Sequence, residues 1–566
     1  MPEETTGRAV GGGELVIRQL EKLGVHRVFM VAGESFLPCI DALRDRDTIE
    51  TIWFRQEGGA AYAAEAHAKL TGEPGICFVT RGPGATNASI GLHVAMQDGT
   101  PMILFVGQIG SDTVERQCFQ EIDYRRMFGQ VAKWVGSIDR TDRIPELIAR
   151  AWRIACSGRP GPVVLALPED TLWGQADVPA IAAAPLPRPG PSDDDMQAIL
   201  DALAAAQRPF VLAGGHGWDD VSRTSLQDFA QRFDLPVGVS WRRFEAFDNR
   251  HPNFAGHVGY GMQPSLRQRI ADADLVIAVN TRINEPTSEG YTLFESPVPR
   301  QRLIHIHADA QELGTVYRAD HAIVATPAGF ARKLAGLAPA GEVAWAGSAA
   351  AANSDYRASL TPPAANTQLD LSAVSASLST VLPLDAVVTV GAGNFALYPH
   401  RFLQFTGRGT QASPICGSMG YGLPAAIAAK LEWPERRVVC FAGDGCFQMT
   451  LQEMATASQH RLGIVIILCN NSAWGTIRAH QERDYPGRSF GLNLENPDFA
   501  RLAQAYGGFG EVVEATDDFL PAWYRATTFA DVNRRPALIE LRYDVDAIAP
   551  DTTLTEIRKA AEDAGR

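Results

Sequence analysis

Uniformly apolar runs alternate with amphipathic or alanine-rich stretches along most of the chain. In the first 170 residues, β-branched and aromatic runs predict strands at 27–31, 76–80, 102–107 and 163–167. Alanine-rich stretches between them predict helices at 56–70 and 88–97. Strands that are apolar on both faces and are separated by helices indicate a parallel sheet covered on both sides.

The same alternation recurs twice more. Further strands are predicted at 210–213, 275–279 and 303–307, and then at 386–390, 437–442, 464–470 and 537–541. A Pro/Ala-rich stretch at 178–191 and an Ala/Ser/Gly/Pro-rich stretch at 338–366 lack periodicity and predict linkers. We therefore predict an α/β protein of three domains, each a mainly parallel sheet flanked by helices, over 1–177, 192–340 and 366–550.

Charge narrows the classes of partner. The chain has 51 Lys and Arg against 65 Asp and Glu, a formal net charge of −14. This excess argues against nucleic acid and anionic membranes as partners, because both are polyanionic. An anionic small substrate would need a locally positive site, such as a bound metal.

Cysteine usage and the N-terminus bear on location. The eight cysteines form no Cys-x-x-Cys pair, and several lie in apolar runs, so we expect buried free thiols in a reducing compartment. The N-terminal segment has no basic region followed by an apolar one, and no apolar run approaches the ~18–20 residues needed to span a bilayer. A cytoplasmic protein is expected.

One predicted βαβ unit of the third block carries polar side chains where its strands end. Strand 437–442 runs into Gly443-Asp444-Gly445, a helix is predicted over 446–459, and strand 464–470 leads into Asn471. The carboxyl ends of parallel strands are where α/β sheets bind ligands. A carboxylate, an amide oxygen and a carbonyl from the following loop form a hard-oxygen ligand set that suits Mg²⁺. Flanking glycines and a helix N-terminus suit a diphosphate, although Gly-Asp-Gly alone is equally typical of an ordinary tight turn.

Asp444 and Asn471 are 471 − 444 = 27 positions apart. This arrangement resembles the thiamine-diphosphate (ThDP) enzymes, whose motif is GDG followed after about 25–30 residues by NN. The resemblance implies that Asp444, Asn471 and the carbonyl of Ala473 ligate Mg²⁺. It also implies that cofactor-binding positions of the same loop include Gly443, Gly445 and Cys446.

Glu57 begins the predicted alanine-rich helix and is followed by two glycines. A first-turn glutamate commonly stabilises the helix dipole. The resemblance instead implies that Glu57 is the glutamate that hydrogen-bonds to N1′ of the aminopyrimidine, which promotes removal of the C2 proton of the thiazolium.

Two glycine-rich segments of the third block have alternative interpretations. Residues 417–424 resemble the family's GTMGYGLP segment, which implies that Met419 supports the bent cofactor and that the Gly417 carbonyl binds its 4′-amine; taken alone, the segment reads as a glycine turn with a core methionine. Gly391, Gly393 and Asn394 lie in a G-x-G-x-x-A pattern typical of dinucleotide binding. An NAD-dependent dehydrogenase would need an acidic residue about 20 positions on, and 405–424 contains none. The resemblance places this segment beside the ThDP diphosphate.

Motifs of the first block indicate one branch of the family. Residues 80–87 (TRGPGATN), 107–108 (GQ), 119–121 (FQE) and 158–163 (GRPGPV) resemble the acetolactate synthase group, which includes acetohydroxyacid synthases and pyruvate oxidases. The resemblance implies a carboligase or lyase that decarboxylates a 2-oxo acid such as pyruvate and transfers the remaining group to a second carbonyl. Phe119 and Gln120 would lie near the reacting carbonyl, with Gln120 as a hydrogen-bond donor, whereas core packing is the other interpretation of Phe119.

Three departures from that group bear on the substrate: a lost proline, a carboxylate at Glu34 and a histidine at position 480. Ala32-Gly33-Glu34-Ser35 stands where the group carries Pro-Gly-Gly, and His480 stands where the branched-chain enzymes carry a tryptophan. His480 is thus either an acid–base or substrate contact or a solvated helix residue. In the central block, the glycine-rich turn 213–217 and Arg282 are placed as in relatives that hold FAD or ADP.

The resemblance also bears on assembly and leaves alternatives open. It implies active sites shared between subunits, with Glu57 of one chain meeting the Asp444 motif of another in a homodimer or homotetramer. Alternatives on the same cofactor are a 2-oxo acid decarboxylase, a 2-hydroxyacyl-CoA lyase and a cyclic-dione hydrolase. A catalytically idle regulatory subunit is a further alternative, which the presence of Glu57 disfavours.

Overall fold

The computed structural model describes residues 9–364 and 367–565. Residues 1–8, at the start of the predicted first domain, and residues 365–366, at the end of the predicted second linker, lie outside this description, as does residue 566. Within the described ranges, no helix is both long and apolar enough to cross a membrane.

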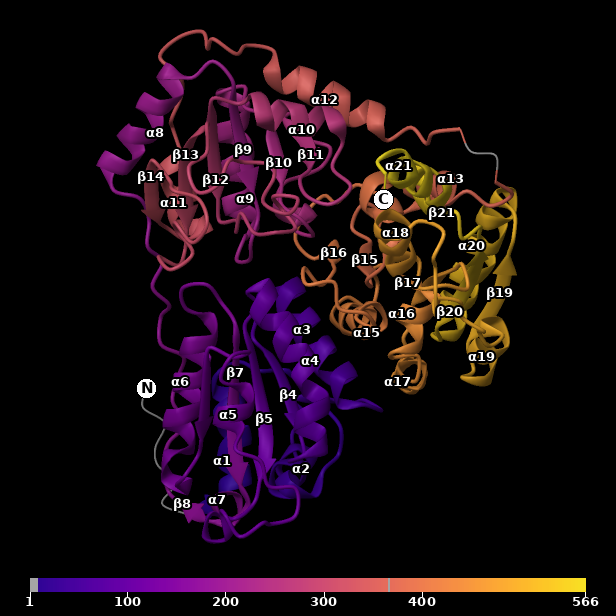
Figure 1. Ribbon diagram of the computed structural model, residues 1–566. Helices are drawn as coiled ribbons and strands as arrows, with labels where there is room; N and C mark the ends of the chain where they lie inside the picture. The colour runs from indigo at the N-terminus through magenta and orange to yellow at the C-terminus, as the bar shows by residue number, and fades with distance from the viewer. Residues whose placement is uncertain (1–8, 365–366, 566) are drawn as a thin grey trace. The chain divides into compact units, whose positions relative to one another are not determined.

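Three six-stranded sheets with only parallel pairings organise the chain (Figure 1). The first has the order β3-β2-β4-β5-β7-β6. Its strands are β2 (Arg27–Met30), β3 (Glu50–Trp53), β4 (Gly75–Val79), β5 (Met102–Gln108), β6 (Trp134–Ser137) and β7 (Pro162–Pro168). Its helices are α1 (Gly12–Lys22), α2 (Leu37–Arg44), α3 (Glu57–Thr71), α4 (Pro83–Asp98), α5 (Tyr124–Phe128), α6 (Ile144–Cys156) and α7 (Glu169–Trp173).

The central sheet has the order β11-β10-β9-β12-β13-β14, a doubly wound arrangement. Its strands are β9 (Pro209–Ala213), β10 (Val237–Val239), β11 (Phe254–His257), β12 (Leu275–Val279), β13 (Arg302–His307) and β14 (His321–Val324). Its helices are α8 (Asp193–Ala205), α9 (Asp220–Arg232), α10 (Pro264–Asp272), α11 (Pro327–Leu334) and α12 (Ser348–Ser359).

The third sheet has the order β16-β15-β17-β18-β20-β19. Its strands are β15 (Val387–Val390), β16 (Gln411–Ala412), β17 (Val438–Gly443), β18 (Val465–Asn470), β19 (Phe509–Val513) and β20 (Ala537–Arg542). The helices of this part are α13 (Leu371–Val381), α14 (Leu397–Phe402), α15 (Gly422–Glu432), α16 (Asp444–Gln448), α17 (Glu453–Gln459), α18 (Gly475–Asp484), α19 (Phe499–Ala505), α20 (Phe519–Asn533) and α21 (Leu554–Asp563). Two antiparallel pairs complete the sheets: β1 (Val10–Gly11) with β8 (Gln175–Ala176), and β21 (Ala547–Ala549) with β22 (Thr552–Thr553).

The first and third sheets have the same strand order. Numbered within each sheet, both read 2-1-3-4-6-5, although no residue-level repeat is visible in the sequence. In this order, strand 2 is added on one side of strand 1 and strand 3 on the other, so the strand order reverses between strands 1 and 3, which is where open α/β sheets bind ligands. The reversal points lie between β2 and β4 in the first sheet and between β15 and β17 in the third.

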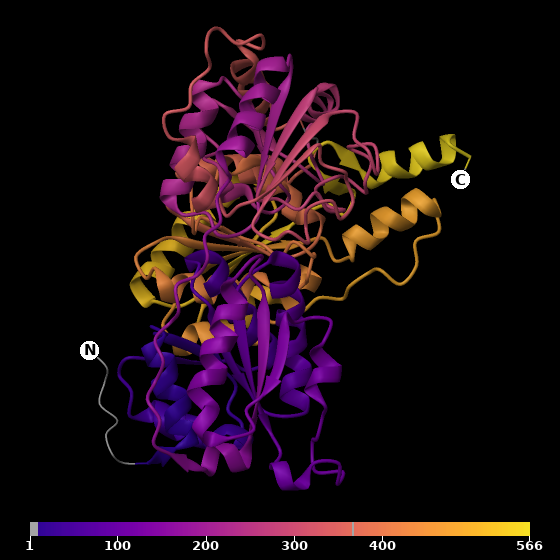
Figure 2. The same cartoon turned by 90° about the vertical axis from the view of Figure 1, so that its left-hand side faces the viewer.

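Helices cover both faces of the first sheet, as predicted (Figure 2). On one face, α1 and α6 bury an apolar stripe against alternate side chains of the strands. On the other face, α3 is buried along nearly its whole length. A Cβ at Gly91 of α4 would lie only 2.4 Å from Cβ of Ala61 on α3, so small side chains hold these two helices close together.

The chain forms two compact units. One contains the residues described up to 187 together with 423–432 and 450–461, so that α15 and α17 cluster with the first sheet. The other contains 188–422, 433–449 and 462–565 and holds the central and third sheets.

Two predictions about elements were wrong. The helix predicted over 446–459 is interrupted: α16 ends at Gln448 and α17 begins at Glu453. The residues between them form three-residue-spaced hydrogen bonds, such as Glu453 N–H to the Thr450 carbonyl, which break the α-helical repeat. The predicted second linker contains α12, which is fixed by tertiary contacts because Tyr356 is buried against Phe254.

The cysteine prediction holds in part. All eight cysteines are free thiols, as expected. Five are buried, whereas three are partly exposed: Cys118, Cys156 and Cys416.

Candidate active site

The reversal point of the third sheet collects the residues that the sequence singled out. Gly391 follows β15, and Asp444 follows β17. The register pairs Gly443 with Cys469, so Asp444 lies beside Asn470 at the end of β18. A carboxylate and the Asn470-Asn471 pair therefore emerge at one edge of one sheet.

Asn496 holds this edge together, and sequence reasoning missed it. Its side-chain N–H₂ donates to Oδ2 of Asp444 at 2.8 Å and to Oδ1 of Asn470 at 2.9 Å. Gln448 donates to Oδ1 of Asn496 at 3.0 Å, and Asn470 donates to the buried carboxylate of Glu540 at 2.8 Å. The side-chain amide of Asn470 is thus hydrogen-bonded within the protein through both its nitrogen and its oxygen. The only signal for Asn496 in the sequence is an Asn-Pro turn, which carries no indication of this role.

Two of the predicted ligand oxygens, in the loop after β18, accept hydrogen bonds from within that loop. Asn471 Oδ1 accepts a hydrogen bond from the N–H of Ala473 at 3.2 Å, and the Ala473 carbonyl accepts one from Gly475 at 2.9 Å. Ser472 between them adopts φ 53°, which turns the chain sharply. Burial raises the pKa of Asp444, while hydrogen bonds from Asn496 and from backbone N–H groups partly offset the rise. A divalent cation beside this carboxylate would favour its charged form.

Cys446 joins the glycine-rich segments of the third block. Its Sγ accepts hydrogen bonds from the N–H of Gly420 at 3.2 Å and of Ala392 at 3.4 Å. A Cβ at Gly391 would lie 2.5 Å from the same sulfur. The thiol is buried, and burial raises its pKa, so Cys446 acts here as a neutral anchor between loops.

The glycines around Asp444 are packed against aromatic rings. A Cβ at Gly445 would lie 2.3 Å from the ring of Trp474, and one at Gly443 would lie 2.8 Å from the ring of Phe395. Packing against these rings is one explanation for a glycine at both positions. The approach of a diphosphate, which the sequence predicts, is the other explanation.

The remaining predicted cofactor positions lie in the same unit. Gly393 has φ 149°, and the following Asn394 is fixed by Thr476, whose hydroxyl donates to Asn394 Oδ1 at 2.7 Å. Gly417 has φ 69°, and a Cβ there would meet no atom within 4 Å. Met419 is partly buried against the apolar core.

Glu57 is the first residue of α3, in the other unit. Gln56 caps the helix by accepting a hydrogen bond from the N–H of Gly59 at 3.1 Å. The Glu57 Oε2 atom accepts a hydrogen bond from the side chain of Asn87 at 2.9 Å. A Cβ at Gly84 would lie 3.3 Å from Oε1 of Glu57. The start of α4 therefore fixes the carboxylate and stays close to it because it carries a glycine.

Gly59 packs against a second, buried carboxylate. A Cβ there would lie 2.8 Å from Oε1 of Glu453, which begins α17. Glu453 Oε2 accepts hydrogen bonds from Thr456 at 2.6 Å and from the N–H of Arg55 at 3.2 Å. Oε1 is buried and makes no hydrogen bond with the described residues. Burial raises the pKa of Glu453 to about 7.

The Phe119-Gln120 segment folds against the loop that follows β4. Gln120 adopts φ 66°, and its Cβ would lie 2.7 Å from a Cβ at Gly82. The Glu121 carboxylate fixes the segment by accepting hydrogen bonds from the backbone N–H of Glu115 at 2.7 Å and of Cys118 at 3.2 Å. Phe119 is 74% exposed in the chain, so the core-packing interpretation of this residue is wrong.

Two departures from the family pattern contact each other. Arg81, which stands in TRGPGATN where the family has serine, donates to Glu34 Oε1 at 3.0 Å and forms an ion pair with Glu169. Arg81 Nε also donates to the Phe119 carbonyl at 3.3 Å. The three charged groups sum to 1 − 2 = −1 at the reversal point of the first sheet. The motif gives no signal for Arg81, because its glycines, and not the residue at this position, define it.

His480 lies on α18 and is exposed. The solvated-helix interpretation therefore describes its place in the chain, and the structure shows no hydrogen bond or ion pair for it within the described ranges. Any contact with a substrate remains a prediction.

The glycine-rich turn of the central sheet follows β9 at the reversal point between β9 and β12. A Cβ at Gly214 would lie 1.9 Å from Ser240 Oγ, and one at Gly215 would lie 1.8 Å from the Asn280 carbonyl. Arg282 is paired with Glu312 at 2.9 Å. Close packing within the protein explains both glycines.

Comparisons with known proteins identify all three blocks. Residues 10–127 match the model of the thiamine pyrophosphate enzyme N-terminal TPP binding domain, residues 196–334 its central domain, and residues 391–541 its C-terminal TPP binding domain. The chain is 31% identical over 526 residues to the acetolactate synthase large subunit of Parasynechococcus marenigrum, covering 90% of this chain and 84% of that protein. It is 30% identical over 524 residues to the acetolactate synthase isozyme 3 large subunit of Escherichia coli, covering 88% and 89%. It is also 30% identical over 568 residues to a probable acetolactate synthase large subunit of Methanocaldococcus jannaschii, covering 96% and 95%.

Proposed function

Because the chain belongs to the thiamine pyrophosphate enzyme family, we propose that it is an Mg²⁺-dependent carboligase that decarboxylates pyruvate or a related 2-oxo acid and joins the remaining group to a second carbonyl compound. The observation that carries this proposal is the pair of fixed carboxylates. The side-chain N–H₂ of Asn496 holds Asp444, and that of Asn87 holds Glu57 at the start of a buried helix.

The donor set at Asp444 fits Mg²⁺ and a diphosphate. Asp444, Asn471 and the Ala473 carbonyl offer three hard oxygens, and Mg²⁺ commonly takes its remaining ligands from phosphate and water. Asn496 orients the carboxylate of Asp444 through a hydrogen bond of 2.8 Å. Cys446 keeps the Ala392 and Gly420 segments together beside it.

Glu57 would act on the aminopyrimidine of ThDP. Asn87 donates to one oxygen of its carboxylate and so fixes the side chain. Glu57 would hold a proton at N1′ of the aminopyrimidine, which is a positioning and acid–base role. When bound, ThDP itself supplies the electron sink for cleavage and formation of bonds next to a carbonyl.

Phe119, Gln120 and the Glu34–Arg81–Glu169 cluster would face the substrate. Gln120 offers an amide donor to a carbonyl oxygen, and the exposed Phe119 offers an apolar surface. Glu34, which replaces a family glycine, is not a lone charge because Arg81 pairs with it. His480, on the exposed surface of α18, would take part in the choice of acceptor.

A nucleotide in the central domain is a separate proposal. The Gly214 turn and Arg282 both lie at the reversal point of a doubly wound sheet, which favours FAD or ADP there. Visible absorbance of the purified protein tests for flavin. A protein that releases no FAD or ADP on denaturation would contradict this proposal. The proposed carboligase reaction would be unaffected.

A panel of donors tests the proposed reaction against its alternatives. Purified protein with ThDP and Mg²⁺ is given pyruvate, longer 2-oxo acids, a 2-hydroxyacyl-CoA and a cyclic dione in separate reactions. We expect consumption of pyruvate with acetolactate as the main product. Acetaldehyde as the main product would indicate a decarboxylase, and consumption of only the acyl-CoA or the dione would overturn the 2-oxo acid assignment.

A further inference from the structure

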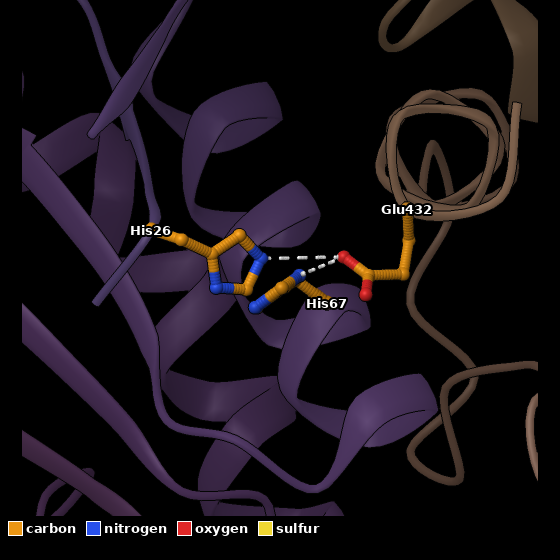
Figure 3. Close-up of side chains that lie close together, drawn as sticks. All are labelled: His26, His67 and Glu432. Atoms are coloured by element: carbon orange, nitrogen blue, oxygen red, sulfur yellow. Dashed lines mark ion pairs between the residues drawn. The ribbon is translucent and has the colours of Figure 1, made fainter. Parts of the chain in front are cut away.

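Two histidines and a glutamate converge in the unit that holds the first sheet (Figure 3). His26 immediately precedes β2, His67 lies on α3, and Glu432 is the last residue of α15. None of the three belongs to a motif recognised in the sequence. Segments distant in sequence therefore bring two imidazoles to one carboxylate.

The distances fit a single metal ion. His26 Nε2 lies 3.5 Å from Glu432 Oε2, and His67 Nδ1 lies 3.6 Å from the same oxygen. The three ligand atoms all lie within 4.8 Å of one another. Zinc binds nitrogen and oxygen at about 2.0–2.2 Å in tetrahedral sites, which places neighbouring ligand atoms roughly 3.3–3.6 Å apart.

His67 has a donor atom that the protein leaves unused. Its side chain is only 4% exposed, and its buried Nδ1 makes no hydrogen bond with any described residue. Buried ring nitrogens normally find a partner, so such an atom requires an explanation.

Outer contacts orient two of the ligands. Glu73 Oε2 lies 3.5 Å from Nδ1 of His26, on the ring nitrogen opposite the one that faces Glu432. A carboxylate behind a ligating histidine is a typical second layer of zinc sites. Arg27 donates to Glu432 Oε2 at 2.7 Å and also to Glu50 at 2.9 Å. An ionised carboxylate oxygen has two lone pairs, so this bond leaves room for a metal.

We propose that the protein binds one Zn²⁺ through His26 Nε2, His67 Nδ1 and Glu432 Oε2, with water as the fourth ligand. Two imidazoles and a carboxylate suit Zn²⁺ better than Mg²⁺, which prefers oxygen ligands. The site thus differs in chemistry from the oxygen-lined loop at Asp444. The ion would cross-link α3 and the segment before β2 to the end of α15. His26, whose side chain is 42% exposed, gives the ion access from solvent.

Metal content of the intact protein tests the site. The full chain with ThDP and an excess of Mg²⁺, which fills any oxygen-ligand site, is given Zn²⁺, dialysed and analysed by mass spectrometry for zinc. We expect about one zinc per chain in the wild type, and at least a tenfold weaker Zn²⁺ affinity in His26→Gln and Glu73→Gln. His93→Gln, at an exposed histidine of α4, is the matched control and is expected to bind as the wild type does.

The absorbance of bound Co²⁺ distinguishes a histidine that binds metal from one that only supports the fold. Co²⁺ in the wild type should give the visible absorbance of tetrahedral nitrogen and oxygen ligands, and His26→Gln should lose it. A wild type that binds no Zn²⁺, or a His26→Gln variant with wild-type zinc affinity, would overturn the proposal. The cluster would then be an ion network in which Glu432 pairs only with Arg27.

Discussion

At the scale of single residues, Glu57 at the start of α3 has two interpretations: it stabilises the helix dipole, or it takes part in the chemistry. A glutamate in the first turn stabilises a helix whatever else it does. Glu57, however, is also held by the side chain of Asn87 at 2.9 Å, and the glycine at position 84 keeps α4 close to its carboxylate. Fixing a helix-dipole residue requires no such contacts, so they favour a role in chemistry.

Replacing Glu57 by Gln should separate these two roles. We expect turnover to fall by at least about 10²-fold, because the carboxylate proposed to transfer the proton is lost, while Tm changes by only a few degrees. Glu146→Gln, at the exposed first turn of α6, removes an equivalent charge and should leave turnover intact. Steady-state kinetics and thermal unfolding measure both effects. Wild-type turnover in Glu57→Gln would rule out the proposed role.

Glu453 should make stability fall as pH rises. Its pKa is about 7 in the folded chain against an ordinary 4.5, so the folded state binds more protons than the unfolded state between these values. The contribution of Glu453 to stability is then fully present below about pH 4.5 and falls by up to about 3 kcal/mol by pH 7. In Glu453→Gln this contribution is absent. Tm measured across the same range should therefore fall more steeply in the wild type, and parallel curves would contradict the assignment.

At the scale of elements, apolar runs predicted the strands well, because strands buried on both faces leave little choice of register or face. Periodicity failed where tertiary contacts decide the backbone. The 446–459 helix is interrupted so that Glu453 can turn into its buried contacts with Arg55 and Thr456. The α12 helix lies in a stretch whose composition resembles a linker, and it is specified by the burial of Tyr356.

The candidate site was predictable to the extent that its residues stand in a spaced motif. Asp444 and Asn471 were identified because strand ends and a fixed spacing locate them. Asn496 comes from a loop without periodicity, and Arg81 is an unusual residue inside a familiar pattern. Their contacts with Asp444 and Glu34 depend on tertiary geometry that one sequence does not express.

The contact between the β15 loop and α16 can be tested by a pair of substitutions. Gly391→Ala places a methyl group 2.5 Å from Cys446 Sγ, so we expect a loss of about 1–3 kcal/mol in stability and weaker ThDP binding. Cys446→Ala removes the sulfur and should relieve part of this loss in the double variant. Chemical unfolding and ThDP titration of the four proteins measure the coupling. Strictly additive effects would mean that the sulfur is not the obstacle.

At the scale of the whole molecule, the first and third sheets share one strand order. In the third sheet, Gly391 and Asp444 follow the two strands at the reversal point, and in the first, Gln120 packs against Gly82 in the loop after β4. Glu57 and Asp444 belong to different compact units of the chain. We propose that the two act together in sites shared between the subunits of a homodimer or homotetramer.

Mixing two inactive variants tests for shared sites. Glu57→Gln and Asp444→Ala each remove one half of the proposed site. If the halves come from different chains, then mixed dimers contain one intact site, and co-expressed variants should regain up to about half of wild-type activity per dimer. The separate variants, mixed without subunit exchange, serve as the control. Mixed oligomers that form but stay inactive would argue for sites within one chain.

The most direct measurement is pyruvate turnover by protein stripped of small molecules, before and after addition of ThDP and Mg²⁺, with acetolactate, acetoin and acetaldehyde resolved. Our account predicts negligible turnover without the two additions and acetolactate as the main product with both. Turnover that is independent of ThDP would contradict the account. So would a stripped protein that binds ThDP with Mg²⁺ but consumes no 2-oxo acid.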